Sequence, residues 1–259
     1  WGAPSDTVRL GTIAGRKVAF LSRHGVGHRL SPSEVPYAAN VCAMKMVGVT
    51  RLVSISAVGS LIEGAPPRSF LVPDQLFDRT INRRRTYFDD GIVAHVGMAD
   101  PFCDALSADV ATAALAGHLP VQRGGAYVCI EGPQFSTRFE SEIFRSWGCS
   151  VIGMTALPEA RLAREAQLCY ACLAMVTDYD VWHHSGESVS VELVIGNLVA
   201  MTEAVQTIVV EMASQEPTAC AHGCASALEQ ALITDRRRID EATRRRLAPI
   251  AGDLLRDVE

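Results

Sequence analysis

The chain has 259 residues, of which 48% are hydrophobic, and a formal net charge of −5. This length suits one α/β domain or two small ones, and the negative charge argues against a protein that binds nucleic acid or an anionic membrane surface. We find no signal peptide and no apolar run long enough for a transmembrane helix, so we expect a cytoplasmic protein.

Short β-branched runs alternate with helical stretches along the whole chain. In chain order, we expect a strand at 17–22, a helix at 35–48, strands at 51–57 and 70–76, a helix at 101–117, a strand at 125–131, a helix at 138–148, a strand at 150–154, a helix at 157–167, a strand at 169–178, and helices at 190–214 and 224–234. This alternation predicts an α/β fold, a single domain with a mixed central β-sheet flanked by helices.

Polar side chains follow several of these strands, where ligands bind in sheets of this kind. Arg23 and His24 come directly after the first strand. The planar donor fork of arginine suits phosphate or a carboxylate, although a surface turn with a salt bridge would look the same. Ser56 and Ala57 close the second strand, where small residues either expose backbone N–H groups to an anion or form an ordinary turn.

The stretch from Gly132 to Arg138 begins with a rigid Gly-Pro turn. Ser136 or Thr137 could cap the helix that follows, whereas Phe135 is either a stacking surface for a planar ligand or a core anchor. Thr155 lies between a strand and a helix, so it is either an N-cap or part of an anion site at the helix N-terminus.

Asp178 and Asp180 end the most apolar of the expected strands. In an extended chain, residues i and i+2 project to the same side. A carboxyl group at this position in a dry pocket is a candidate general acid, because burial raises its pKa.

Four stretches occur in order that together closely resemble the 5'-methylthioadenosine phosphorylase branch of the trimeric purine nucleoside phosphorylase family. They are Arg23-His24-Gly25, Ile130 to Arg138, Gly153 to Glu159, and Thr177-Asp178-Tyr179-Asp180. The resemblance extends from about Pro4 to about Ile233, nearly the whole chain.

The resemblance implies roles for the matching residues. The phosphate ligands would be Arg23, His24, Ser56, Ala57 and Thr155; the ribose would meet Met154; the base would meet Phe135, Ser136, Asp178 and Asp180; and the 5' substituent would meet Val191, Val194, Ile195 and His95, the last from a neighbouring subunit of a homotrimer. Asp178 would be the catalytic acid. The reaction would need no cofactor and no metal, with inorganic phosphate as co-substrate.

The resemblance also implies the choice of base. Phosphorylases for 6-oxopurines resemble this chain but have asparagine at the position of Asp178. A carboxylate accepts a hydrogen bond from an amino group, so the chain is expected to act on 6-aminopurine nucleosides, 5'-methylthioadenosine first among them.

The expected domain covers 1–234, followed by an arginine-rich tail at 235–259 that forms a solvated, salt-bridged helix. We expect the strand and glycine-rich phosphate loop with which the family begins to be absent from this chain. The cysteines at 42, 129, 169 and 172 lie in apolar stretches and are expected to be core residues. Cys220 and Cys224, with His222 between them, are free thiols, a disulfide, or part of a metal site.

Three alternatives remain open from the sequence. The substrate could be another adenine nucleoside, with a different 5' substituent or none. The enzyme could be a nucleoside hydrolase, although an enzyme that uses water does not need the positively charged site that Arg23 and His24 would form. The chain could also be a nucleoside-binding protein without catalytic activity.

Overall fold

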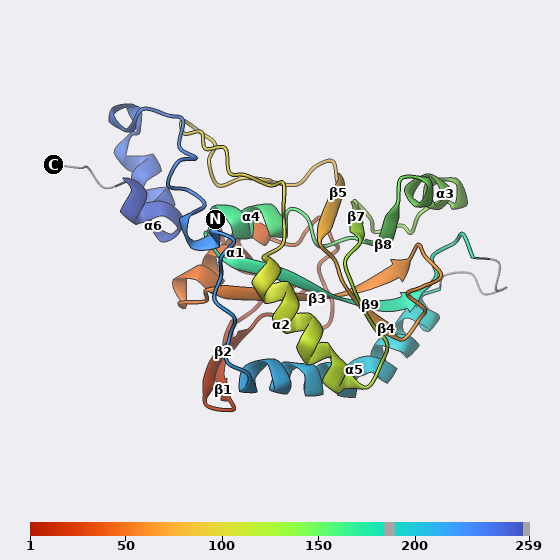
Figure 1. Cartoon of the computed structure of the whole chain (residues 1–259). Helices are drawn as coiled ribbons and strands as arrows, with labels where there is room; N and C mark the ends of the chain where they lie inside the picture. Colours follow the sequence, from red (N-terminus) through yellow and green to blue (C-terminus); the bar gives the residue numbers. More distant parts are fainter. Residues whose placement is uncertain (184–189, 256–259) are drawn as a thin grey trace.

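A seven-stranded mixed sheet forms the centre of the protein (Figure 1). The computed structural model describes residues 1–183 and 190–255. The strand order is β5-β7-β8-β3-β9-β4-β6, and all neighbours are parallel except β3–β8 and β4–β9. The strands are β3 (Arg51–Ser60), β4 (Ser69–Val72), β5 (Gln75–Arg79), β6 (Val121–Arg123), β7 (Ala126–Ile130), β8 (Cys149–Gly153) and β9 (Cys169–Asp178). The α/β fold expected from the sequence is confirmed.

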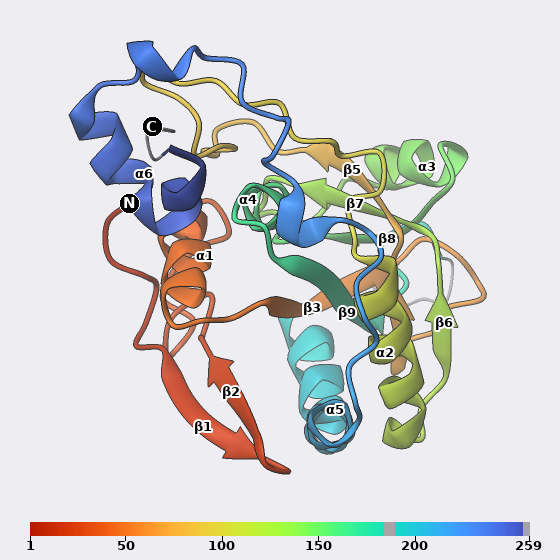
Figure 2. The same cartoon turned by 60° about the vertical axis from the view of Figure 1, so that its left-hand side comes forward.

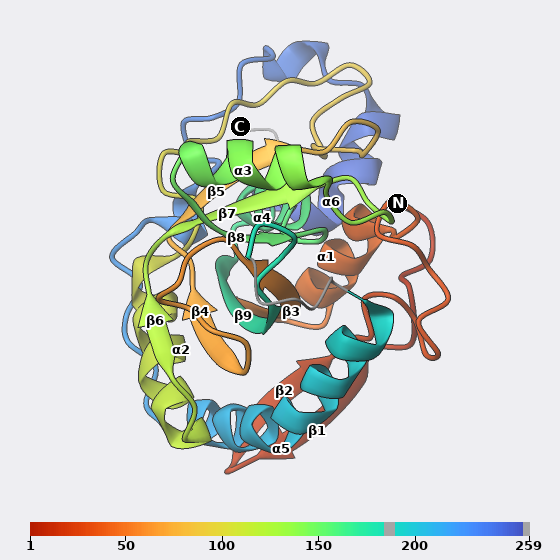
Figure 3. The same cartoon turned by 90° about the vertical axis from the view of Figure 1, so that its right-hand side faces the viewer.

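Helices cover both faces of the sheet (Figures 2 and 3). They are α1 (Tyr37–Met46), α2 (Asp104–Ala114), α3 (Arg138–Ser146), α4 (Glu159–Glu165), α5 (Val191–Ser214) and α6 (Glu241–Leu255), with short 3-10 turns η1 (Leu115–Gly117), η2 (Cys224–Ser226) and η3 (Arg236–Arg238). Alternate residues of β9 face opposite ways, as the two-residue period of a strand requires. Leu173 packs in the cluster that includes α2 and α5, and Cys172 packs in the cluster that includes α1, α4 and α6. Because both faces of β9 are covered, its sequence is apolar from Cys169 to Val176.

The first expected strand is real but lies outside the central sheet. β2 (Arg16–Phe20) pairs with β1 (Arg9–Ile13), which the sequence analysis did not identify, in a separate antiparallel hairpin. The turn Gly15 has φ 81°, a conformation that glycine adopts without strain. The segment after β2 therefore does not follow a strand of the central sheet.

Three other expectations need correction. The strand expected at 70–76 is two strands, because proline at 73 cannot donate a ladder hydrogen bond. β3 extends to Ser60, so Ser56 and Ala57 lie within the strand and not after it. The helix expected at 224–234 is only the 3-10 turn η2 followed by further turns. That segment instead pairs with an earlier one through the bridge Ala94–Leu232.

The C-terminal tail folds onto the body of the protein. α6 is a helix, as expected, but its Leu247 and Ile250 are buried in the same core cluster as α1 and the sheet. Arg246 pairs with Asp89 at 3.1 Å and donates to the Asp89 carbonyl at 2.6 Å. The tail is thus only partly solvated.

α5 is the one helix among the described residues that is long and apolar enough, by length and composition, to cross a membrane. The sequence analysis identified no such run. A helix that packs on the body of a protein passes the same test, and α5 packs on α2, β9 and the β1–β2 hairpin. Its outer face still exposes Ile195, Val199 and Val210.

Candidate functional site

Two carboxyl groups lie together at the carboxyl end of β9. Asp178 is the last residue of the strand, and Asp180 has φ 51°, in the left-handed region. The Asp180 backbone N–H donates to Asp178 Oδ1 at 2.8 Å. The sequence analysis expected the pair to share a side because the chain stays extended. The structure brings them together by a turn, in which the Asp178 side chain accepts from the backbone two residues on.

Burial raises the pKa of both carboxyl groups. Only 5% of Asp178 and 7% of Asp180 is exposed. Burial raises the pKa of Asp178, and burial together with the charge of Asp178 raises the pKa of Asp180 to about 6. Asp180 Oδ2 is buried without a hydrogen-bond partner among the described residues. A buried oxygen of this kind is costly to leave unpaired, so the pair is suited to a ligand that donates a hydrogen bond.

Asp180→Asn should stabilise the free protein at neutral pH. The folded-state pKa of Asp180 is about 6, above its ordinary value of 3.8. The folded state therefore binds a proton more tightly than the unfolded state, so this group favours folding at acid pH and opposes it as pH rises through 6. Removing the charge should raise the free energy of unfolding at pH 7.5 by about 3 kcal/mol, a gain that largely disappears by about pH 4.

Denaturant unfolding between pH 4 and 8 measures this difference. Asp90→Asn is the matched control, because Asp90 has the same φ of 51° and its side chain is 79% exposed. A stability gain for Asp180→Asn that does not depend on pH would contradict the raised pKa.

A glycine on the neighbouring strand makes room for the acid pair. A Cβ atom at Gly59 of β3 would lie 2.9 Å from Asp178 Oδ1 and 3.2 Å from Asp180 Cβ. The Thr177 hydroxyl lies 2.7 Å from Asp178 Oδ2 and 3.2 Å from the Val58 carbonyl. The backbone of β3 and the side chain of Thr177 together fix where the carboxylates point.

The turn before α3 presents an aromatic ring and a free hydroxyl. Gly132–Pro133 is a cis peptide bond, and Thr137 caps α3 in a capping box with Glu140. Ser136 is therefore not the cap, and its hydroxyl is buried without a partner among the described residues. Phe135 is 45% exposed, so it is not a core anchor. The turn leaves Phe135 free to stack on a planar ligand.

Arg83 connects this turn to the Met154 loop, and the sequence analysis missed it. The Arg83 side chain is 1% exposed. Its Nη1 donates to the carbonyls of Met154 at 2.6 Å and Leu157 at 2.7 Å, and its Nη2 donates to the Glu131 carbonyl at 2.6 Å. The Arg83 guanidinium thus fixes two segments, the turn before α3 and the Met154 loop. The family resemblance assigns these segments to the base and the ribose. No local pattern around Arg83 indicates this, because its partners are 48 to 74 residues away.

Two residues predicted to hold phosphate come together between β3 and α4. The hydroxyls of Ser56 and Thr155 are 3.0 Å apart, and Tyr127 Oη lies 3.4 Å from Ser56 Oγ. Thr155 is not a helix cap, since α4 begins after Pro158. A Cβ atom at Gly153 would overlap the Tyr127 hydroxyl, which explains why this position has no side chain.

The other two side chains predicted to bind phosphate, Arg23 and His24, contact other parts of the protein. Arg23 Nη1 donates to Ser54 Oγ at 2.8 Å and pairs with Glu159 at 3.2 Å, and Nη2 donates to the Ile55 carbonyl at 2.9 Å. Burial opposes the charge of Arg23, but Glu159 together with the nearby tyrosines outweighs this effect and raises the pKa of Arg23. Arg23 Nε is buried without a partner among the described residues.

A hydrogen bond at Nδ1 of its ring holds His24 in place. Its Nδ1 lies 2.9 Å from the Leu30 carbonyl, and its ring stacks on His28 with centroids 4.1 Å apart. Since a carbonyl only accepts, Nδ1 carries a proton. Burial lowers the pKa of His24, so Nε2 is free of a proton at neutral pH.

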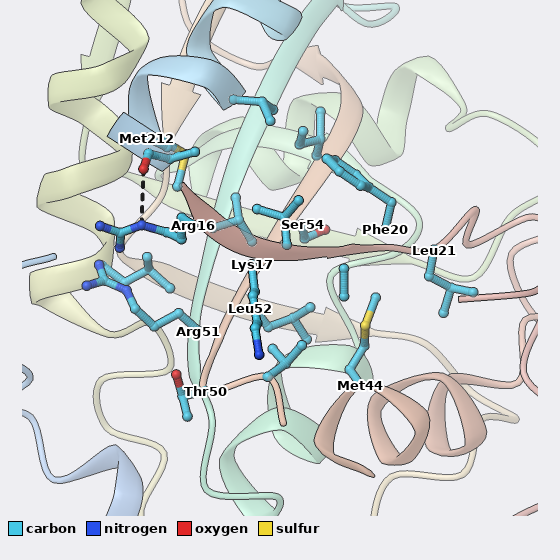
Figure 4. Close-up of a pocket in the computed structure, with 18 of the residues that line it drawn as sticks. Arg16, Lys17, Phe20, Leu21, Met44, Thr50, Arg51, Leu52, Ser54 and Met212 are labelled. Carbon is cyan, nitrogen blue, oxygen red and sulfur yellow. Dashed lines mark hydrogen bonds between the residues drawn. The ribbon is translucent and has the colours of Figure 1, made fainter. Parts of the chain in front are cut away.

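A cavity of about 1140 Å³ runs from Arg23 and His24 along one edge of β3. Figure 4 shows Leu52 and Ser54 of β3, Met44 of α1 and Lys17 of β2 around it. On this side β3 pairs with β8 only at Gly59 and Ser60, so most of its length has no strand partner among the described residues. The cavity does not include the acid pair.

The residues predicted for the 5' pocket lie in two places. Val191, Val194 and Ile195 share one face of the first turns of α5. α5 is tied to the end of β9, because Asn197 Nδ2 donates to the Thr177 carbonyl at 2.6 Å. His95 is exposed on the connection between β5 and α2, which runs towards α6 (Figure 1), and its N–H donates to the Ala231 carbonyl at 2.8 Å.

Comparison with known proteins gives a consistent result. Residues 1–214 match the Phosphorylase superfamily. The S-methyl-5'-thioadenosine phosphorylase of Gloeobacter violaceus is 51% identical over 256 residues, 96% of this chain and 85% of that protein, and that of Koribacter versatilis is 49% identical over 97% and 86%. A crystal structure of a methylthioadenosine phosphorylase from an Antarctic soil metagenomic library has a TM-score of 0.90 at 45% identity, covering 96% of this chain and 88% of that one. The methylthioadenosine phosphorylase of Schistosoma mansoni in complex with adenine has a TM-score of 0.84 at 34% identity, covering 89% and 90%.

Proposed function

The chain belongs to the phosphorylase superfamily, and we propose that it splits 5'-methylthioadenosine with inorganic phosphate to give adenine and 5-methylthioribose 1-phosphate. The observation that carries this proposal is the buried acid pair, Asp178 and Asp180, at the end of β9. The burial of this pair favours the protonated form of a carboxyl group. A purine leaving group needs a proton from such a group.

Asp178 and Asp180 recognise the base. Asp178 gives its proton to N7 while the bond between N9 and C1' breaks, so that adenine leaves as a neutral molecule. Asp180, whose Oδ2 has no partner among the described residues, accepts from the 6-amino group. The Ser136 hydroxyl forms a hydrogen bond with the base beside Asp180, and Phe135 stacks on the purine ring.

Phosphate attacks from the opposite side of the sugar. The sugar develops oxocarbenium character, and a phosphate oxygen then forms the bond to C1'. Ser56, Ala57 and Thr155 contact this anion, Arg23 contributes a fixed positive charge, and His24 donates through Nε2 once it is protonated. Met154, whose carbonyl Arg83 holds, packs under the sugar.

The proposals for the 5' pocket and for the assembly both rest on α5. Val191, Val194 and Ile195 form an apolar wall that suits a methylthio group. We propose a homotrimer in which the exposed apolar face of α5 is covered and His95 of each subunit completes a neighbour's 5' pocket. We further propose a cytoplasmic salvage enzyme, with no metal or cofactor in the reaction.

A panel of nucleosides tests the proposed substrate. We expect kcat/KM for 5'-methylthioadenosine to exceed that for 5'-methylthioinosine by about ten- to hundred-fold, because a 6-oxo group leaves a buried carboxylate without a donor. Adenosine and 5'-deoxyadenosine, which share the base, measure the preference for the 5' group. Equal values for the 6-amino and 6-oxo nucleosides would contradict the roles of Asp178 and Asp180.

A further inference from the structure

Four cysteines from distant parts of the sequence meet at one point. They are Cys103, Cys169, Cys220 and Cys224, and their Sγ atoms all lie within 4.8 Å of one another. Cys103 immediately precedes α2 and Cys169 begins β9. The other two lie in the segment between α5 and α6. The sequence analysis considered only Cys220 and Cys224, because nothing local connects these to the other pair.

The spacing of the sulfurs fits one shared metal ion. Four thiolates around Zn²⁺ at about 2.3 Å form a tetrahedron whose sulfurs are about 3.8 Å apart. Cys103 Sγ and Cys220 Sγ are 3.7 Å apart. A disulfide needs about 2.05 Å, and it would account for two sulfurs at a time and not for the convergence of four.

The Cys220–Cys224 segment has the form of a metal-binding turn. The two cysteines are separated by three residues, within the range common in structural zinc sites. Gly223 between them has φ 71°, which turns the chain tightly so that both sulfurs face the same way.

A buried arginine places a positive charge beside the cluster. Arg164, which is buried, donates from Nη1 to Cys224 Sγ at 3.7 Å and from Nη2 to the Asp100 carbonyl at 2.5 Å. Four thiolates and Zn²⁺ carry two negative charges, which the guanidinium partly offsets, as outer-shell donors do at other metal sites.

We infer that these four cysteines bind one structural Zn²⁺ ion. The site lies at the start of β9, whereas Asp178 lies at its end, nine residues and about 30 Å away. The ion therefore takes no part in the reaction at the acid pair. It ties the segment after α5 to α2 and β9, and this segment in turn pairs with the stretch that carries His95.

The metal content of the full-length protein, purified without chelators, tests this inference. We expect about one zinc per chain, with an X-ray absorption spectrum of four sulfur ligands at about 2.3 Å. A protein without zinc that also takes up none from added ZnCl₂ would overturn the inference, as would disulfides among these cysteines in the unreduced protein. Iron in place of zinc would overturn the choice of metal.

Cys220→Ser tests the ligand set, because Cys220 is the exposed member of the cluster and the least needed for packing. We expect at least a tenfold loss of zinc affinity. Cys149→Ser is the matched control, a buried cysteine outside the cluster, and should keep its zinc. Zinc retained in Cys220→Ser at unchanged affinity would overturn the assignment.

A second measurement does not depend on the folding of a variant. Cobalt added to the metal-free wild-type protein should give the intense near-ultraviolet thiolate charge-transfer absorption of a tetrahedral sulfur site, saturating at about one equivalent. Absence of this band would overturn the inference. Phosphorolysis is measured separately, so the zinc site and the proposed activity stand or fall independently.

Discussion

Asp178→Asn should lower kcat for 5'-methylthioadenosine by about 10²- to 10³-fold. Asparagine has nearly the same shape but no proton to give to N7, and general acid catalysis contributes about 10²- to 10⁴-fold. The asparagine amide can donate to a 6-oxo group, so the ratio of kcat/KM values should shift towards 5'-methylthioinosine. Steady-state kinetics with both nucleosides measures the loss and the shift together.

The free energy of unfolding separates this result from a folding defect. Since burial raises the pKa of Asp178, removing its charge should not destabilise the protein at neutral pH. Asp90→Asn, at an exposed carboxylate, should leave both activities unchanged. Unaltered kinetics of Asp178→Asn with both bases would contradict the role given to Asp178.

Arg83→Met should lower the free energy of unfolding by about 3 kcal/mol or more. The substitution leaves the carbonyls of Glu131, Met154 and Leu157 without their shared donor, and each unpaired buried group costs about 1–3 kcal/mol. We expect kcat/KM to fall as well, because the ribose and base segments lose their common support. Chemical denaturation and steady-state kinetics measure the two effects.

Two variants make this test specific. Arg84→Met removes the adjacent arginine, whose side chain is 44% exposed and whose ion pairs with Asp89 and Asp90 lie at the surface, so its effect should stay within about 1 kcal/mol. Arg83→Lys keeps the charge but not the planar fork and should be intermediate. Equal stabilities for the Arg83→Met and Arg84→Met proteins would rule out the proposed support.

The fold was predictable because its signals are local. The apolar run of β9 and the capping box of α3 can be read within ten residues of sequence. The separate β1–β2 hairpin could not be predicted, since periodicity indicates a strand but not its partner. The 224–234 segment looked helical because its pairing with Ala94 is invisible locally.

The site residues also fall into two groups, those that the local sequence predicts and those that it does not. Asp178 and Phe135 follow obvious strand ends and turns, so the sequence was sufficient to single them out. Arg83 and Glu159 act on atoms far along the chain, through buried contacts that no spacing reveals. The cysteine cluster is the extreme case, because its members are up to 121 residues apart (Cys103 to Cys224) and meet only in the folded protein.

The most direct test of the proposed activity is the balance of phosphate against adenine during turnover of 5'-methylthioadenosine. Adenine can be followed by its absorbance and the sugar phosphate by ³¹P NMR in the same sample. We expect one phosphate consumed and one 5-methylthioribose 1-phosphate formed for each adenine released, with no release when phosphate is omitted. Adenine released without consumption of phosphate would show a hydrolase, and nucleoside binding without release would show a binding protein; either result would contradict the account.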